Sequence, residues 1–515
     1  MRSRATALCT WVSLAVSLVT LSSGCTSDSH ESPVPPVPAT NRYVARECPA
    51  EVTAALVGTV ECGTLTVPEN RTQNTGTVRL LVTSLTPAEV LADDPIVVLG
   101  TDIATRPNYA GIAPLTQRTG RRVLILEQRG TGHSEPSLAC PPPQDPSQLI
   151  TWSDRTGSPR WEGKSERLAS RCLHSLEDKG VDVSSYNVTE MAADVADLIT
   201  VLDLAPADLV SSGSASRIAF ELMRTHANAL RAVVMDTPDV PGFDPRAVAA
   251  GRTDRAVAQV LLWCDQDPDC QETYPEPVRL LRRASATVTE RPMSLNVSTQ
   301  GSRQRVVLDA ALLARVARQT LTDGGSAGSW GLPEALPALL TAVADRDRPQ
   351  VDAALSELLG VQGPLCPGYH GKCMSAHVVD EGVYNTVLCQ DIVPFAPSAR
   401  PARRADQALH QAYDRNWWWN ICEHWPTLSA HTGAADPVST DVPVLILAGG
   451  LAASTPERAI RSATRGLRNV SVILAPTGSH NVIGQPCLNR IRVAWLNDLM
   501  PRPRSPRCLE RRVEW

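Results

Sequence analysis

Residues 208–216 read DLVSSGSAS, so an apolar strand at Asp208–Val210 runs directly into a turn of small residues. A helix is predicted from about Arg217 to Thr225, and a second apolar strand, Ala232–Asp236, comes next. Strand, turn, helix and strand in this order are typical of a parallel sheet whose strands are joined through helices. This stretch therefore predicts an α/β fold.

Similar patterns extend outward on both sides. We expect strands at 78–88, 95–100, 121–127, 442–447 and 470–474, and helices at 189–202 and near 488–499. Between the two groups of strands, helical segments and short cysteine-closed loops dominate, and three tryptophans stand together at 417–419. A sheet that is interrupted and later resumed indicates one domain with an insertion. The predicted parts are a core at 43–236, a lid insertion at 237–435 and the rest of the core at 436–515.

The N-terminus has the pattern of an export signal. Arg2 and Arg4 precede an apolar run that is short for a membrane span, and the run ends in the sequence LSSGC at residues 21–25. Small residues before a cysteine resemble a bacterial lipobox, which predicts a signal peptide at 1–25 and lipidation of Cys25. The alternative is simple secretion with Cys25 as a spare thiol. Segment 26–42 is polar and proline-rich and is predicted to be a flexible tether.

The cysteines support an exported location. Apart from Cys9 and Cys25 there are twelve, and an even number in an exported chain favours disulfides. We expect sequential neighbours to pair, although sequence alone does not fix connectivity: Cys48 with Cys62, Cys140 with Cys172, Cys264 with Cys270, Cys366 with Cys373, Cys389 with Cys422, and Cys487 with Cys508. The expected location is the outer face of the cell membrane, through a lipid anchor, or the medium.

Several classes of function find no support in the sequence. The net charge of -5 and pI of about 6.1 do not indicate a nucleic-acid partner. No CxxC pair is present and the histidines do not cluster at ligand spacings, so we expect no metal. The chain has no P-loop and no GxGxxG after a strand, so we expect no cofactor.

The segment EQRGTGHSEPSLAC at residues 127–140 carries a specific resemblance. It resembles the D-x-R-G-x-G-x-S-x-P segment of actinobacterial secreted tripeptidyl aminopeptidases, which are relatives of proline iminopeptidases. The resemblance extends from about Cys48 to Cys508 and includes the closing Gly478-Ser479-His480. It implies an α/β-hydrolase fold, with a mostly parallel sheet, helices on both faces and a large, mainly helical lid. It also implies a serine hydrolase or peptidase.

The nucleophile position of that family is changed in this sequence. The family places a serine in a G-x-S-x-G turn that is forced into a positive-φ conformation. Aligned without gaps, Gly213 occupies this position, and glycine adopts positive φ but has no side chain. If the turn slides by one residue, Ser214 becomes the candidate nucleophile, and Ser212 is a further alternative.

The acid and oxyanion positions have changed as well. Ala452 stands where the resemblance implies the aspartate, while His480 matches the catalytic base. Asp236 or Asp239 could supply a relocated acid, although a structural role for Asp236 is favoured. The oxyanion turn is implied at Gly100 and Thr101, and it is followed by Asp102, a negative charge that would oppose an oxyanion.

These changes predict an exported cell-envelope protein of the tripeptidyl aminopeptidase type that is catalytically impaired and binds a peptide or small apolar ligand in the old cleft. The first alternative is an active serine exopeptidase or esterase that uses Ser214 with His480. The second is a purely structural envelope lipoprotein. Whether the chain is an enzyme stays open at this point.

Overall fold

The computed structural model describes residues 42–56, 58–100, 102–141, 143–145, 148, 159–243, 249–299, 302–322, 333–362, 380–395, 417–426, 435–452, 455–478, 485–499, 509, 513 and 515. The predicted signal peptide and most of the predicted tether lie outside these residues. Arg42, the last residue of the predicted tether, already belongs to a strand.

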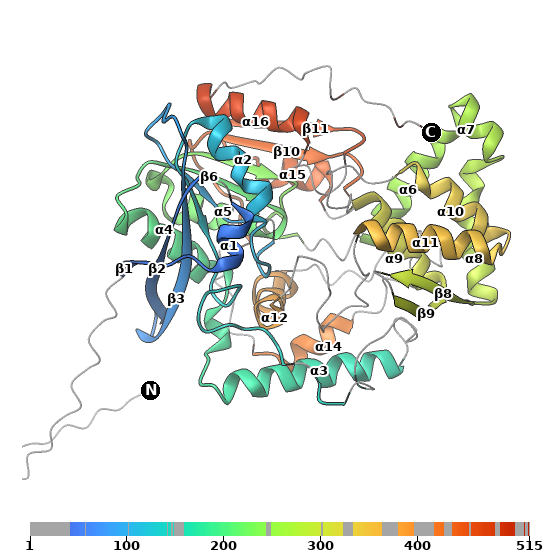
Figure 1. The fold of residues 1–515 in the computed structure, drawn as a ribbon, viewed down its shortest axis with the longest axis horizontal. Helices are drawn as coiled ribbons and strands as arrows, with labels where there is room; N and C mark the ends of the chain where they lie inside the picture. Colours follow the sequence, from blue (N-terminus) through green and yellow to red (C-terminus); the bar gives the residue numbers. More distant parts are fainter. Residues whose placement is uncertain are drawn as a thin grey trace, which may run out of the picture. The chain divides into compact units, whose positions relative to one another are not determined.

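A nine-stranded sheet forms the centre of the described chain (Figure 1). Its strands are β1 Arg42–Arg46, β2 Thr59–Asn70, β3 Thr75–Thr86, β4 Ile96–Val98, β5 Val123–Leu126, β6 Ala207–Ser212, β7 Leu230–Asp236, β10 Val444–Gly449 and β11 Val470–Ala475. The spatial order is β1-β2-β3-β5-β4-β6-β7-β10-β11, with parallel pairing from β5 to β11 and antiparallel pairing among β1, β2, β3 and β5. This is an α/β-hydrolase fold, as predicted.

Alternate residues of the buried strands face opposite sides of this sheet. In β4, Val97 joins one apolar core, whereas Ile96 and Val98 join the other. On the first side lie α3 (Pro159–Glu177), α4 (Val188–Val201), α5 (Ser216–Thr225) and α15 (Glu457–Ala463); on the second lie α1 (Ala50–Ala55), α2 (Tyr109–Thr119) and α16 (Pro486–Asp498). The near-continuous apolar runs of these strands are explained by the helices that cover both faces.

The insertion consists of two parts with different cores. The first has an apolar core of its own and comprises α6 (Ala249–Asp265), α7 (Pro268–Thr273), α8 (Pro277–Glu290), β8 (Met293–Thr299), β9 (Ser302–Leu308), α9 (Ala310–Thr322), α10 (Ala335–Ala344) and α11 (Arg348–Gln362). The antiparallel hairpin of β8 and β9 was not predicted. Strand β8 alternates apolar and polar residues, with Leu295 and Val297 buried against the helices, which is a strand pattern within an otherwise helical segment. Strand β9 does not alternate: its polar half precedes its apolar half.

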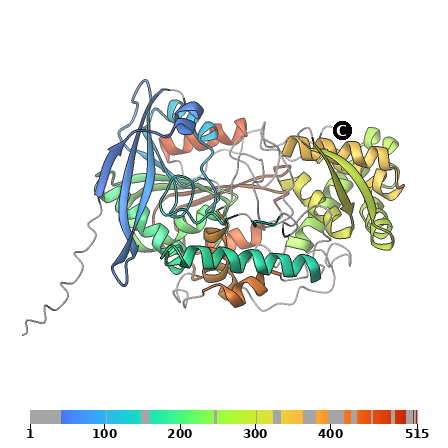
Figure 2. The ribbon, with the colours of Figure 1, turned by 60° about the horizontal axis from the view of Figure 1, so that its bottom comes forward.

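The second part of the insertion packs on the main core. It contains α12 (Glu381–Val387) and α14 (Trp417–His424), and Val383, Ile421 and Trp425 are buried in the same apolar core as α4 and α5. Figure 2 shows α14 beside the long helix α3. The first part therefore carries its own core, and the second extends the core of the sheet.

Four of the predicted disulfides are present: Cys48–Cys62, Cys140–Cys172, Cys264–Cys270 and Cys389–Cys422. Cys487 is also disulfide-bonded. Cys366, Cys373 and Cys508 lie outside the described residues. Each of the four bonds joins neighbours in the sequence of cysteines.

Arg129 of the EQRG segment is completely buried and has a structural role. Its Nε and Nη2 donate to the two carboxylate oxygens of Asp194 on α4, each over 2.7 Å. Its Nη1 donates to the backbone carbonyls of Glu69 and Ser185 over 2.7 and 2.6 Å. The planar guanidinium thus joins β2, the loop after β5, and α4 in one site that a lysine cannot reproduce.

Candidate functional site

The candidate site lies at the carboxyl ends of the parallel strands. The strand order reverses at β4, because β5 pairs with it on one side and β6 on the other. In open α/β sheets, ligands bind in the crevice outside such a reversal point. The loops that follow β4, β6, β7 and β10 carry Gly100, Gly213, Asp239 and Ala452 at this edge.

The turn after β6 is centred on Gly213. Its φ of 51° places it in the left-handed region, while Ser212 before it is extended, with φ -143° and ψ 157°. The chain then forms a 3-10 turn over Gly213–Ala215 and continues into α5. A side chain rarely adopts this φ without strain, and glycine adopts it readily. Gly213 is thus the left-handed residue of this turn, and Ser214 lies on its helical side.

The hydroxyl of Ser214 faces the loop after β4. The backbone N–H of Ile103 donates to Ser214 Oγ over 3.0 Å, and Ser214 Oγ in turn donates to Asp102 Oδ1. Gly100, with φ 86°, accepts a hydrogen bond at its carbonyl from the Ser212 N–H over 3.2 Å. The loop and the turn are thus joined at two places. Thr101 lies outside the described residues.

The loop after β10 carries no carboxylate at its described site position. Ala452 is fully buried, and its carbonyl accepts a hydrogen bond from Arg252 Nη2 of α6 over 2.8 Å. Burial, together with the nearby charges of Arg255 and Arg458, lowers the pKa of Arg252 to about 10. The insertion therefore places a cationic side chain beside the position where the resemblance implies an acid.

The two alternative acids have different surroundings. Both carboxylate oxygens of Asp236 accept from Arg492 Nη2 over 2.7 Å, and both side chains are buried. Burial raises the pKa of Asp236, and Arg492 opposes this effect. Asp239, by contrast, lies at the turn after β6: its backbone N–H donates to the Gly213 carbonyl over 2.9 Å, and its Oδ1 accepts from Thr455 Oγ1 over 3.5 Å.

His480 lies outside the described residues, so its distances to Ser214 and Asp239 are not part of this geometry. Within the described residues, no group of three or more histidine, cysteine, aspartate or glutamate side chains is arranged to hold a metal ion. None of the described helices is long and apolar enough to cross a membrane.

Asp380 is a buried carboxylate at this edge that sequence reasoning missed. It precedes α12; its Oδ2 accepts from the Gly132 N–H over 3.1 Å, and its own N–H donates to the Ala104 carbonyl over 2.8 Å. Burial raises its pKa to about 7. It thereby joins the second part of the insertion to the loops after β4 and β5. No local motif marks Asp380, because its partners are distant in the sequence.

Comparison with known proteins agrees with this fold. Residues 410–506 match the family model described as TAP-like protein. The resemblance to tripeptidyl aminopeptidase-like α/β-hydrolases is thus confirmed over this segment, which includes the loop with Ala452. No curated protein matches the sequence.

Similar solved structures include three of related architecture. A proline iminopeptidase from Mycobacterium smegmatis is 13% identical and has a TM-score of 0.38, with 84% of this chain and 97% of that chain covered. A proline iminopeptidase-related protein from Thermus thermophilus is 14% identical, with a TM-score of 0.35 and coverage of 86% and 99%. An esterase from Thermogutta terrifontis is 13% identical, with a TM-score of 0.36 and coverage of 85% and 98%.

Proposed function

We propose that this TAP-like α/β-hydrolase chain is an exported cell-envelope protein that has lost serine hydrolysis and uses the old cleft to bind a peptide or small apolar ligand. The observation that supports the loss of chemistry is the positive φ of 51° at Gly213, the position where the fold requires a nucleophile. A glycine there preserves the turn and supplies no attacking oxygen.

The contacts of Ser214 support the same proposal. A nucleophile needs its hydroxyl within hydrogen-bond reach of a base, with backbone N–H groups aimed at the developing oxyanion. Here the Ile103 N–H donates to Ser214 Oγ, and the partner of that hydroxyl is the carboxylate of Asp102. A negative charge at this place raises the free energy of an oxyanionic transition state. Ala452 in the acid position removes the group that would orient His480.

A fluorophosphonate probe tests the loss of chemistry on the folded protein. We expect no stoichiometric labelling of the unmodified chain or of Ser214→Ala. Labelling of Ser214 that disappears in both Ser214→Ala and His480→Ala would contradict the proposal. Ser84→Ala is the matched control, because Ser84 lies in β3 and has no part in the turn.

The alternative is an active serine hydrolase that uses Ser214 with His480 and a relocated acid. The position of Asp239 favours this alternative. Its backbone N–H donates a hydrogen bond to the Gly213 carbonyl, and its carboxylate forms no described ion pair with an arginine. In that case Asp239→Asn would abolish the fluorophosphonate labelling, whereas Asp102→Asn would preserve or increase it.

Export and ligand binding are further parts of the proposal. Disulfides such as Cys48–Cys62 persist in oxidising compartments, which supports export. Mass spectrometry of the mature protein from native membranes should find an acylated N-terminal cysteine at position 25, and Cys25→Ser should release the protein into the medium. Binding of short peptides or acyl compounds should raise the melting temperature of the purified protein. If neither class binds, the chain has a purely structural role.

A further inference from the structure

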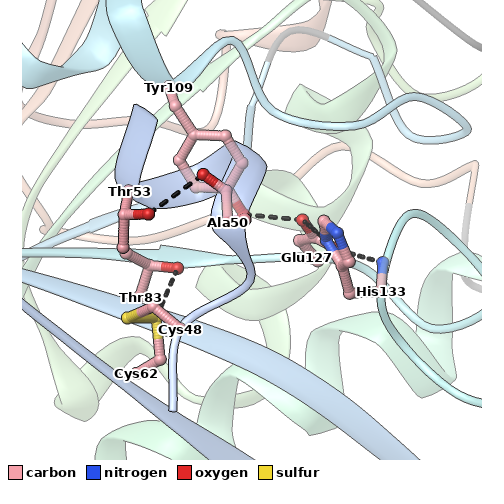
Figure 3. The surroundings of a disulfide bond; sticks show 8 residues. All are labelled: Cys48, Ala50, Thr53, Cys62, Thr83, Tyr109, Glu127 and His133. Atoms are coloured by element: carbon pink, nitrogen blue, oxygen red, sulfur yellow. Dashed lines mark hydrogen bonds and ion pairs between the residues drawn. A yellow bond between two sulfur atoms is a disulfide. The ribbon is translucent and has the colours of Figure 1, made fainter. Parts of the chain in front are cut away.

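The imidazole of His133 lies between two carboxylates from different parts of the chain. Its Nδ1 is 3.0 Å from Glu127 Oε1, and its Nε2 is 2.7 Å from Glu51 Oε1. Figure 3 shows the pair of Glu127 and His133 beside Tyr109 and the Cys48–Cys62 disulfide. The histidine belongs to the loop after β5, and Glu51 belongs to α1.

Glu127 is the fixed partner in this arrangement. Its side chain is fully buried, and the Tyr109 hydroxyl donates to its Oε1 over 2.6 Å. The backbone N–H of His133 donates to its Oε2. Gly132 makes room for this carboxylate: at its φ of 58°, a Cβ would lie 2.1 Å from Glu127 Oε2. The loop is therefore built around the Glu127 carboxylate.

Glu51 is the exposed partner. Its side chain is 60% exposed and contacts both His133 and Arg106 Nη1, the latter over 3.0 Å. Arg106 belongs to the loop after β4, the same loop whose Ile103 N–H donates to Ser214. Helix α1 thus connects the loops after β4 and β5 through one carboxylate. The Cys48–Cys62 disulfide keeps the start of α1 attached to β2 whatever happens to these contacts.

Both contacts of the imidazole require a proton on the ring nitrogen. A carboxylate only accepts hydrogen bonds, and a neutral imidazole has a single N–H, whereas the charged form has two. The hydrogen bond with Glu127, the charge of Glu127 and the hydrogen bond with Glu51 together raise the pKa of His133, and burial opposes this effect. The hydrogen bond with His133 is the main cause that lowers the pKa of Glu51.

We propose that His133 is a proton-controlled clamp: the charged imidazole holds α1 against the loops after β4 and β5, and loss of one proton releases α1. The remaining N–H stays with Glu127, because that carboxylate is buried and cannot be solvated. The bare Nε2 then faces Glu51, two acceptors repel each other, and Glu51 turns toward water. Release of α1 leaves Arg106 without this partner and loosens the loop after β4.

The direction of the pH effect follows from these shifts. The contribution of His133 is fully present below the ordinary histidine value of 6.5 and is lost as pH rises through its raised pKa. The contribution of Glu51 is present above its ordinary value of 4.5 and is lost as pH falls through its lowered pKa. The clamp is therefore closed in mildly acidic solution and opens as the solution becomes alkaline.

Other charged groups lie near His133, Glu51 and Glu127, and the experiment must distinguish their titration from that of His133. Arg106 lowers the pKa of His133, and Asp380, which interacts with Glu127, Glu381 and Arg106, itself titrates at about 7. Asp380 does not touch α1 in the described contacts: its partners are Gly132 and Ala104. Hydrogen exchange measured in α1 alone, together with a substitution of Glu51 alone, distinguishes the titration of His133 from that of Asp380.

Hydrogen exchange of the full-length protein, measured by mass spectrometry and corrected for the intrinsic exchange rate, tests the clamp. We expect the protection of residues 52–56 to fall about tenfold between pH 5.5 and 8.5, because one charge-assisted hydrogen bond of α1 is lost with the proton. In Glu51→Gln and in His133→Asn this pH dependence should disappear. Protection of α15 should not change with pH in any of these proteins.

Glu135→Gln is the matched control. Glu135 is an exposed carboxylate in the same loop, and it pairs with Arg79 and not with the histidine. We expect this variant to keep the full pH dependence at residues 52–56. Equal protection at both pH values in the unmodified protein, or an undiminished pH effect in Glu51→Gln, would overturn the clamp. The result does not depend on whether the cleft has any hydrolase activity.

Discussion

The backbone N–H of Ile103 donates a hydrogen bond to the hydroxyl oxygen of Ser214 over 3.0 Å. Ile103 follows β4 and Ser214 follows β6, and these two neighbouring strands end at the same edge of the sheet. In an active α/β-hydrolase, a backbone N–H of the loop near this place is directed at an oxyanion. Here the N–H has a partner within the chain, and the adjacent Asp102 carries the opposite charge from that of an oxyanion hole.

Gly213 should be intolerant of any side chain. We expect Gly213→Ala to lower the free energy of unfolding by about 1 kcal/mol, because alanine is strained at a φ of 51°. Gly163→Ala in α3 is the contrasting control and should stabilise the protein by up to about 1 kcal/mol, because alanine favours the helix interior. Urea unfolding of both variants checks the pair. Equal effects would show that the turn does not constrain this residue.

Arg129 should be far less replaceable than an exposed arginine. Arg129→Lys loses the bidentate contact with Asp194, which then keeps its pair with Arg71, and leaves backbone carbonyls around the buried site without donors. We expect this variant to destabilise the protein by about 3 kcal/mol. Arg79→Lys, at an exposed pair with Glu135, should change stability by less than about 0.5 kcal/mol. Thermal unfolding measures both. A loss of similar size in the two variants would refute the structural role assigned to Arg129.

We expect Asp236 to have a structural role and Asp239 to contribute little to stability. Asp236→Asn leaves the buried Arg492 without its charged partner and should cost about 3–5 kcal/mol of stability. Asp239→Asn should cost about 1 kcal/mol or less, because its described side-chain contact is a single long hydrogen bond with Thr455. Chemical unfolding of the two variants in parallel checks this. A stable Asp236→Asn would reopen Asp236 as a relocated acid.

Asp380 should make the protein less stable as pH rises from about 4 to 7. Its pKa of about 7 lies above its ordinary value of 3.8, so the folded chain binds a proton that the unfolded chain has released. Asp380→Asn stays neutral and can still accept from the Gly132 N–H. We expect this variant to exceed the unmodified protein in stability at pH 8 by about 1 kcal/mol or more, with no difference below pH 4.

The control for this prediction is Glu457→Gln, an exposed carboxylate on α15 that pairs with Arg461. It should leave the slope of stability against pH unchanged in the same range. Unfolding curves at pH 4, 6 and 8 give these slopes. If Asp380→Asn follows the unmodified protein at every pH, the carboxyl group is already ionised in the folded state at low pH.

Local patterns were sufficient to predict most of the sheet and its connections. The apolar runs at 208–210, 232–236 and 470–474 correspond to β6, β7 and β11, because strands covered by helices on both faces must be apolar along their whole length. The hairpin of β8 and β9 was missed. Only β8 alternates apolar and polar residues, whereas the polar residues of β9 are grouped before its apolar ones, so two short strands between helices gave a weak signal.

Some features of the candidate site could likewise be predicted from local patterns, and others could not. Gly213 could be placed at the turn from its small neighbours, and the structure gives it the positive φ that the pattern requires. The partner of the Ser214 hydroxyl could not be predicted, because Asp102 is more than a hundred residues away and only the pairing of β4 with β6 brings the two together. Asp380 and the carboxylates around His133 were missed for the same reason.

By itself, therefore, the sequence determined most strands of the α/β sheet and the presence of glycine at position 213, since each depends on residue types that are close in the chain. It predicted the pairing of neighbouring cysteines, and the structure shows that pairing for four disulfides. The tertiary structure alone decided where Ser214 points, which aspartate is committed to an arginine, and that His133 lies between Glu51 and Glu127. These relationships arise where loops from distant strands meet at one edge of the sheet, and no local pattern encodes which charges will then become neighbours.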